Sequence, residues 1–147
     1  MVIVDANTWP AVFDPSNQRH GDFRPVKDYI ENNFKSLAWG GSHYVNELRN
    51  CPKYLKMHLE LEKGSRAIRF DDKAIDKDEV RIKQLEDSKD FDDPHIIAIQ
   101  IISKAPIICS CDKRAFDFFK KPIFYPKLHP RPKIYSKKSN KDLFRKI

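Results

Sequence analysis

"PIICSCD", residues 106 to 112, is a short apolar run that ends in an aspartate, and "VIVD", residues 2 to 5, has the same design near the N-terminus. Each run predicts a buried strand that ends in Asp, because strands covered on both faces are apolar almost continuously. Helical patterns lie between and around the two runs, so that strand and helix signals alternate along the chain. Such alternation favours an α/β fold with a central, mostly parallel sheet.

The other elements are predicted from apolar spacing and from cap residues. Further strands are expected at "SLAW" (36–39) and "AIRF" (67–70), and "IFY" (123–125) is expected to form an edge strand. Asp76 and Glu79 have the spacing of a capping box at a helix start. Helices are expected over residues 25–34, 42–50, 53–62 and 76–88.

The stretch "DDPHIIAIQII", residues 92 to 102, is open to two interpretations because its β-branched residues favour a strand. Local signals favour a helix, since Asp93 suits the N-cap, Pro94 suits the first helical position and Pro106 closes the connection. We therefore predict a buried helix. His95 in its first turn is expected to be a surface or packing residue, with a general-acid role as the alternative.

Length and composition define the broad class of protein. A chain of 147 residues suits one domain, and 40% of the residues are hydrophobic. No apolar run approaches the roughly 20 residues that a membrane helix requires, and the N-terminus has no secretory or transit pattern. A cytoplasmic protein without membrane contact is expected.

The cysteines and histidines show no spacing that indicates a disulfide framework or a zinc site. The three cysteines, Cys51, Cys109 and Cys111, cannot pair completely, so a disulfide framework is not expected. A zinc site is not expected either, because there is no Cys-x-x-Cys pair and the five histidines show no ligand spacing.

The net charge of +7 is concentrated at the C-terminus. Residues 113–147 hold 12 Lys and Arg against 2 acids, whereas the preceding 112 residues hold 16 against 19. We predict a folded domain over residues 1–125 and a basic, proline-punctuated appendage over residues 126–147. Two interpretations of the appendage stay open: contact with a polyanion or an acidic partner, or a solvated disordered tail.

Four acids are placed where an α/β fold brings side chains together. Asp5 and Asp112 end two strands, Asp93 begins a helix, and Glu47 lies in the helix that follows "WGGS". The crevice beyond the carboxyl ends of parallel strands is the usual functional site, and carboxylate oxygens suit Mg²⁺ or Mn²⁺. Each acid alone has a simpler interpretation as a helix cap or a solvated glutamate. Two Asp residues at the ends of buried strands are nevertheless costly unless a cation stabilises them.

These motifs also resemble a known family. "VIVDANTW", "GGSHYVNEL", "DDPHIIAIQI" and "IICSCDKRAF" are similar, in order and spacing, to the four motifs of PIN-domain nucleases, over about residues 1–125. The resemblance implies a PIN-like α/β/α sandwich and an endoribonuclease in which Asp5, Glu47, Asp93 and Asp112 bind Mg²⁺ or Mn²⁺. It includes the VapC-type toxins, so a cognate antitoxin and a homodimer are possible partners.

Other polar residues receive roles from this resemblance and from their positions. Asn7 and Ser110 match polar positions that flank the first and fourth acids, and Asp92 is an additional acid with no assigned role. Basic residues are expected to contact RNA phosphates; they are Lys113, Arg114, Arg131, Lys133, Lys137 and Lys138. The alternative function is a noncatalytic RNA-binding or interaction module in which the basic tail binds and the acids are structural.

Overall fold

A single parallel sheet organises the chain, and the computed structural model describes all 147 residues. The strands lie in the order β3-β2-β1-β4-β5, and every neighbouring pair is parallel. The α/β class and the mostly parallel sheet are therefore confirmed. The strands are β1 (Val2–Val4), β2 (Leu37–Gly40), β3 (Ala67–Phe70), β4 (Ile107–Cys109) and β5 (Lys133–Tyr135).

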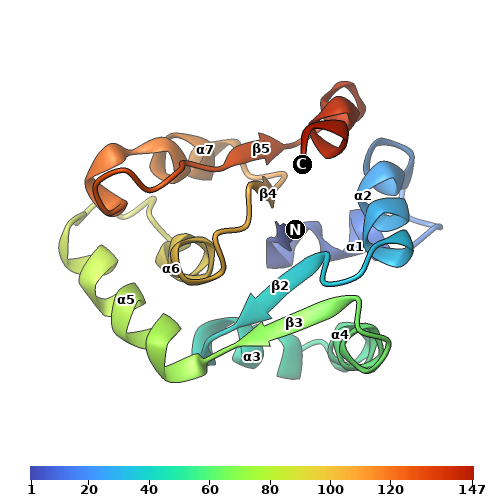
Figure 1. Cartoon of the computed structure of the whole chain (residues 1–147), viewed down its shortest axis with the longest axis horizontal. Coiled ribbons are helices and arrows are strands. Elements are labelled where there is room, and N and C mark those ends of the chain that lie inside the picture. Colours follow the sequence, from blue (N-terminus) through green and yellow to red (C-terminus); the bar gives the residue numbers. More distant parts are fainter.

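Helices flank this sheet, as expected of a PIN-like α/β/α sandwich. Figure 1 shows α5 and α6 on one side of the central strands and α1 and α2 on the other; α6 packs on β1, β2 and β3. None of the helices combines the length and the apolar composition that crossing a bilayer requires. The helices are η1 (Ala6–Thr8), α1 (Trp9–Phe13), α2 (His20–Asn32), α3 (Ser42–Arg49), α4 (Pro52–Lys63), α5 (Asp72–Gln84), α6 (Pro94–Ser103), α7 (Lys113–Lys120), η2 (Pro122–Phe124) and η3 (Lys138–Lys146), where η denotes a 3₁₀ helix.

The order of the strands reverses between β1 and β4. From β1 the chain adds β2 and β3 on one side, and it then returns to add β4 and β5 on the other. β1 and β4 are in register, with Val4 beside Cys109, so the segments that follow them leave the sheet at the same edge. In open parallel sheets, the crevice at such a switch point is where ligands bind.

The helix predicted from "DDPHIIAIQII" is confirmed as α6, with Pro94 at its first position. All side chains from Pro94 to Gln100 are buried, which explains why the run is apolar on every side. Asp93 occupies the N-cap position, but its side chain makes no capping hydrogen bond. Its carboxylate is therefore not committed to the helix end.

Two predicted helix starts were wrong. α2 begins at His20 and continues through Pro25, because burial of Phe23 and Val26 on one face outweighs the lost backbone hydrogen bond. α5 begins at Asp72, since the side chain of Asp71 accepts a hydrogen bond from the backbone N–H of Ala74.

The capping box predicted at Asp76 and Glu79 is therefore absent, and the two acids contact α3 instead. The Asp76 carboxylate accepts hydrogen bonds from the backbone N–H and the hydroxyl of Ser42, the first residue of α3. Glu79 lies beside His43 on the same helix. These contacts join α5 to the helix that carries Glu47.

The C-terminal segment is part of the fold, which corrects the prediction of an appendage. "IFY" at 123–125 is not an edge strand, because η2 occupies most of it; β5, from within residues 126–147, is the edge strand. Tyr135 in β5 is fully buried, and its hydroxyl donates a hydrogen bond to the carbonyl of Asp22. The ring of Phe144 in η3 stacks on Tyr29 at 4.6 Å between centroids. Aromatic burial in this segment thus outweighs its many lysines.

A buried polar network joins the end of β1 to α3 and α4. The Val4 carbonyl accepts hydrogen bonds from the Tyr44 hydroxyl at 2.7 Å and from the Trp9 indole N–H at 3.1 Å. The Tyr44 hydroxyl also lies 3.2 Å from Nε2 of His58, whose Nδ1 is 2.7 Å from the Tyr54 carbonyl. The carbonyl requires a proton on Nδ1, and burial lowers the pKa of His58 to about 4, so the ring is neutral near pH 7 and Nε2 carries a lone pair.

This network predicts a stability that depends on pH. Burial lowers the pKa of His58 from 6.5 to about 4. Between these two pH values the His58 ring binds a proton in the unfolded chain but not in the folded protein. The stabilisation by neutral His58 is present above pH 6.5 and is lost as the pH falls towards 4. Between pH 7.5 and 5, the wild type should lose about 2 kcal/mol more unfolding free energy than His58→Gln, as measured by urea denaturation. Parallel pH profiles for the two proteins would contradict this prediction.

Candidate metal centre

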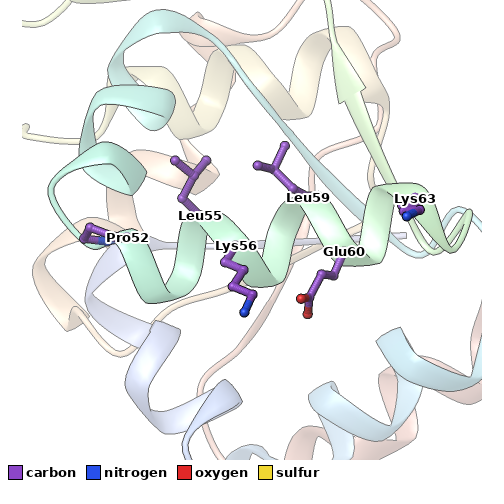
Figure 2. Close-up of a pocket in the computed structure, with 6 residues that line it drawn as sticks. All are labelled: Pro52, Leu55, Lys56, Leu59, Glu60 and Lys63. Carbon is purple, nitrogen blue, oxygen red and sulfur yellow. The ribbon is translucent and has the colours of Figure 1, made fainter.

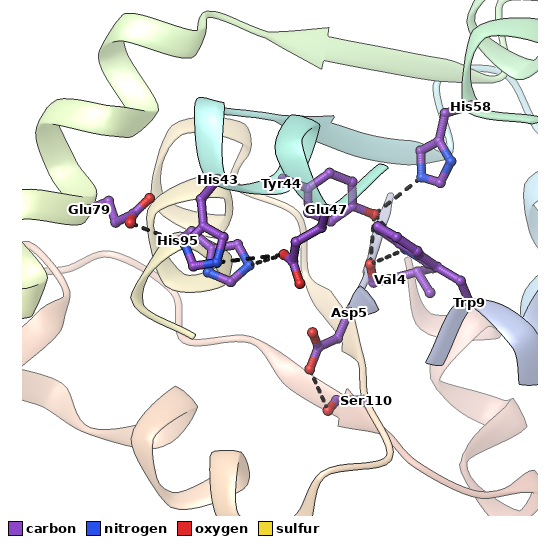
Figure 3. Close-up of polar contacts among 10 residues, drawn as sticks. All are labelled: Val4, Asp5, Trp9, His43, Tyr44, Glu47, His58, Glu79, His95 and Ser110. Atoms are coloured by element: carbon purple, nitrogen blue, oxygen red, sulfur yellow. Dashed lines mark hydrogen bonds and ion pairs between the residues drawn. The ribbon is translucent and has the colours of Figure 1, made fainter. Parts of the chain in front are cut away.

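Asp5 follows β1 directly and lies almost entirely out of solvent, with 2% of its surface exposed. The Ser110 hydroxyl, just beyond β4, donates a hydrogen bond to Asp5 Oδ2 at 3.0 Å (Figure 3). Burial raises the pKa of Asp5 to about 6 against the opposing effect of this hydrogen bond, and the charge of Glu47 adds to the rise. A buried carboxylate is thus held between the two strands of the switch point.

Glu47 reaches the same region because the turn before α3 is unusually tight. Gly40 and Gly41 adopt φ angles of +138° and +84°, and a Cβ at either position would lie within 2.6 Å of a neighbouring atom. Only glycine fits these positions without displacing β3 or α5. Tyr44, three residues before Glu47, anchors α3 to the Val4 carbonyl. In Figure 3 the Glu47 and Asp5 carboxylates face the same space.

Asp93 and Asp112 complete the acidic group from two further helix starts. Burial, followed by the charge of Asp5, raises the pKa of Asp93 to about 7, while His95 lowers it. Asp112 caps α7 by accepting a hydrogen bond from the Arg114 backbone N–H. The Arg114 guanidinium also donates to both Asp112 oxygens, at 3.2 and 3.3 Å. Arg114 is 68% exposed, so this pair is screened by solvent and exchangeable.

The structure therefore brings the four predicted acids into one electrostatic group. Glu47 and Asp112 each raise the pKa of Asp5, and Asp5, Glu47 and Asp112 each raise that of Asp93. The carboxylate oxygens of the four acids do not all lie within 4.8 Å of one another. The one group of possible ligands that meets this limit consists of His43, Glu47 and His95. The acids thus lie within electrostatic range of one another, an arrangement that a divalent cation with several retained waters would suit.

The residues predicted to flank the acids differ in their placement. Ser110 is fully buried and contacts Asp5, as described above. Asn7 is exposed, and its side-chain oxygen accepts a hydrogen bond from the hydroxyl of Thr8, which in turn accepts one from the Cys111 backbone N–H. Asp92 is exposed, and its charge helps to raise the pKa of Arg114. The link through Thr8, between η1 and the segment after β4, was missed by sequence reasoning.

A histidine-containing group that the sequence analysis did not predict lies against Glu47. His95 is 1% exposed, and its Nε2 lies 2.9 Å from Glu47 Oε1, without the geometry of a hydrogen bond. The ring of His43 stacks on His95 at 3.6 Å between centroids, and its Nε2 is 3.9 Å from the same oxygen. His43 and Glu47 are four residues apart on a helix, a spacing that could have revealed the pair. His95 is distant from His43 and Glu47 in the sequence, so no local pattern indicates that it joins them.

The predicted RNA contacts divide between the two ends of the sheet. Lys113 and Arg114 begin α7 beside Asp112, and Lys137 follows the carboxyl end of β5; all three are exposed. Lys138 begins η3 just after them. Arg131 and Lys133 lie at the amino end of β5, where with Lys120 they line a separate hollow. The edge of the sheet that carries the acids is therefore the one near Lys113, Arg114, Lys137 and Lys138.

Two further hollows differ in their relation to the acids. One of about 370 Å³ opens beside Glu47 and Asn7 and is also lined by Trp9, Asn50 and Cys51. The other, of about 300 Å³, lies on α4 away from the acids. Figure 2 shows that its Leu55 and Leu59 project from one side of that helix and Lys56 and Glu60 from another. The hollow beside Glu47 is therefore the one positioned to hold part of a substrate.

No family model matches the sequence, and comparisons with curated proteins and with solved structures likewise found no match. The function of the chain therefore has to be inferred from its own residues and their geometry.

Removing one charge from the acidic group should stabilise the metal-free protein. Asn is nearly isosteric with Asp and carries no charge, and the Asp93 side chain makes no capping hydrogen bond that could be lost, so Asp93→Asn should raise the unfolding free energy at pH 7.5 in EDTA by about 1 kcal/mol. Mg²⁺ should stabilise the wild type and have less effect on the variant. Chemical denaturation with and without Mg²⁺ measures these differences. A variant that is less stable than the wild type in EDTA would show that Asp93 serves the fold rather than the site.

Proposed function

We propose that the chain is a Mg²⁺- or Mn²⁺-dependent endoribonuclease of the PIN type. The observation that carries this proposal is the convergence of Asp5, Glu47, Asp93 and Asp112 at the carboxyl edge of the sheet. They come from four separate elements, and the charges of Asp5, Glu47 and Asp112 all act on Asp93, which supports a shared site near the switch point between β1 and β4. Four acids in a partly buried space are costly on their own and suit a hard divalent cation.

The residues of the site have distinct tasks under this proposal. Asp5, Glu47, Asp93 and Asp112 would hold the cation, which when bound would lower the pKa of an attacking water and neutralise charge on the phosphate. Ser110 fixes the orientation of the Asp5 carboxylate through its hydrogen bond. Hydrolysis of a phosphodiester by such a site needs no histidine base, which agrees with the burial of His95.

Substrate binding has two supports near the acids. The hollow beside Glu47 and Asn7 has a volume of about 370 Å³, and the indole of Trp9 and the side chain of Asn50 contribute to its lining. Lys113 is exposed beside Asp112, where it can contact a substrate phosphate. Arg114 can exchange its pairing with Asp112 for a phosphate oxygen, because Arg binds both groups in the same geometry.

The narrower part of the proposal is that this endoribonuclease is the toxin of a toxin-antitoxin pair, which acts in the cytoplasm as a homodimer. It rests on the VapC-type resemblance of the four motifs. A cognate antitoxin protein would block the acidic site until it is removed. Co-expression with the product of a neighbouring small reading frame tests this role, which requires that product to bind the chain and suppress cleavage.

Cleavage should depend on the metal and on Asp93. Purified wild-type protein should cut single-stranded RNA with Mg²⁺ or Mn²⁺ and lose this activity in EDTA. Asp93→Asn should lower the cleavage rate by about a hundredfold or more, because the cation loses a charged ligand. The matched control is Asp87→Asn, an exposed acid six residues earlier, which should cleave as the wild type does. Equal activity of the two variants would return Asp93 to a structural role, and metal-independent RNA binding without cleavage would favour the noncatalytic alternative.

Affinity for RNA should depend on which edge of the sheet a lysine occupies. Lys113→Ala should weaken RNA binding and reduce the slope of log affinity against log salt by about 0.7, the value for one lost contact to a single strand. Lys133→Ala, at the opposite end of the strands, should change the slope less. Fluorescence anisotropy in EDTA over a salt series separates binding from cleavage. A larger effect at Lys133 than at Lys113 would place the RNA across the other edge of the sheet.

A further inference from the structure

We propose that His43, Glu47 and His95 form a second metal site, which takes a divalent transition metal such as Zn²⁺. One ligand atom from each residue lies within 4.8 Å of the other two, and no other His, Cys, Asp or Glu residues form such a group. This site is beside the acidic group and shares Glu47 with it. It differs in ligand chemistry, because two of its three donors are imidazole nitrogens.

Unpartnered buried atoms point to a missing ligand at this position. Both ring nitrogens of His95 and Oε1 of Glu47 are buried and make no hydrogen bond; Nε2 and Oε1 lie 2.9 Å apart, which is an ion pair only when the ring is protonated. A buried polar atom without a partner costs about 1–3 kcal/mol, so three such atoms within one cluster are unusual in a native fold. A bound cation would satisfy Glu47 Oε1 and one nitrogen of His95 together.

The surroundings of His43 prepare one of its nitrogens for a metal. Glu79 Oε2 lies 3.3 Å from Nδ1 of His43, and its hydrogen bond raises the pKa of that ring. A carboxylate on one nitrogen fixes the proton there and leaves the other nitrogen as a lone-pair donor. That other nitrogen, Nε2, is the one that faces Glu47. The arrangement is the carboxylate–histidine–metal pattern of many zinc sites.

The ligand set favours a nitrogen-preferring ion over Mg²⁺. Imidazole suits Zn²⁺, Co²⁺ and Ni²⁺, whereas Mg²⁺ requires oxygen ligands and near-octahedral geometry. Two histidines and one glutamate also match the three-ligand sets of zinc sites that keep one coordination position open. The ligands come from α3 and α6, and Glu79 comes from α5, so a bound ion would clamp three helices together.

Shared use of Glu47 makes the two sites antagonistic. An ion between the histidines would hold the Glu47 carboxylate away from Asp5 and so lower Mg²⁺-dependent cleavage. This consequence rests on the proposed function, whereas the existence of the second site does not.

Calorimetric titration of metal-free, full-length protein with ZnCl₂, in excess Mg²⁺, tests the site directly. Wild-type protein should bind one Zn²⁺ per chain through this site. His43→Gln and His95→Gln should each weaken binding by about tenfold or more, and Glu79→Gln by about tenfold. Two controls should bind as the wild type does: His20→Gln, a histidine elsewhere, and Cys51→Ser, an exposed thiol. Asp5→Asn, which weakens the competing acidic group, should bind Zn²⁺ at least as tightly as the wild type. His43 is 39% exposed, so its variant is expected to fold even if loss of buried His95 is not tolerated.

The outcomes separate this inference from the proposed function. Zn²⁺ binding that is unchanged in a folded His43→Gln variant, or that is lost in Asp5→Asn but not in the histidine variants, overturns the second site. Zinc binding that depends on the histidines, in a protein that cuts no RNA with Mg²⁺, supports the second site and overturns the nuclease. In an active enzyme, Zn²⁺ should inhibit the wild type and have about tenfold less effect on His43→Gln.

Discussion

The Val4 carbonyl is the point on which the geometry of the site depends. It accepts hydrogen bonds from the Tyr44 hydroxyl and from the Trp9 indole, and these bonds fix α3 and α1 against the end of β1. Asp5 is the next residue along the strand, and Glu47 lies one turn of α3 beyond Tyr44. The same two bonds therefore set the relative position of these acids. A polar network in a dry core is well suited to this task, because its bonds are directional and costly to leave unmade.

The acids that this network positions are held together against their charge. Burial, with a smaller contribution from the charge of Glu47, raises the pKa of Asp5 from 3.8 to about 6, which corresponds to about 3 kcal/mol that favours the neutral carboxyl in the folded protein. The fold tolerates this cost because 34 buried apolar residues form one continuous core around the sheet. Buried and mutually repelling carboxylates are typical of functional sites, where a bound cation can offset their charge.

Glu47 connects two different kinds of metal chemistry. On one side it faces Asp5, within a set of oxygen ligands, and on the other it faces His95 and His43, within a set that is mainly nitrogen. A single carboxylate between a hard and a softer ligand set allows the identity of the metal to determine which set is occupied. The Asp76 and Glu79 contacts matter here, because they bring α5 against α3 and present a carboxylate to His43.

Local sequence determined the elements whose signals are contained within a few residues. The apolar runs at 2–4 and 107–109 could only be buried strands, and Pro94 after Asp93 started α6 although its isoleucines favour a strand. The acids at the ends of these elements were predictable for the same reason, because parallel strands must end at a common edge. The histidine group and β5 were decided by tertiary contacts. His95 meets His43 only when α6 packs beside α3, and the lysine-rich segment becomes a strand only because Tyr135 finds a buried place beside β4. Such pairings depend on long-range packing, which no local pattern encodes.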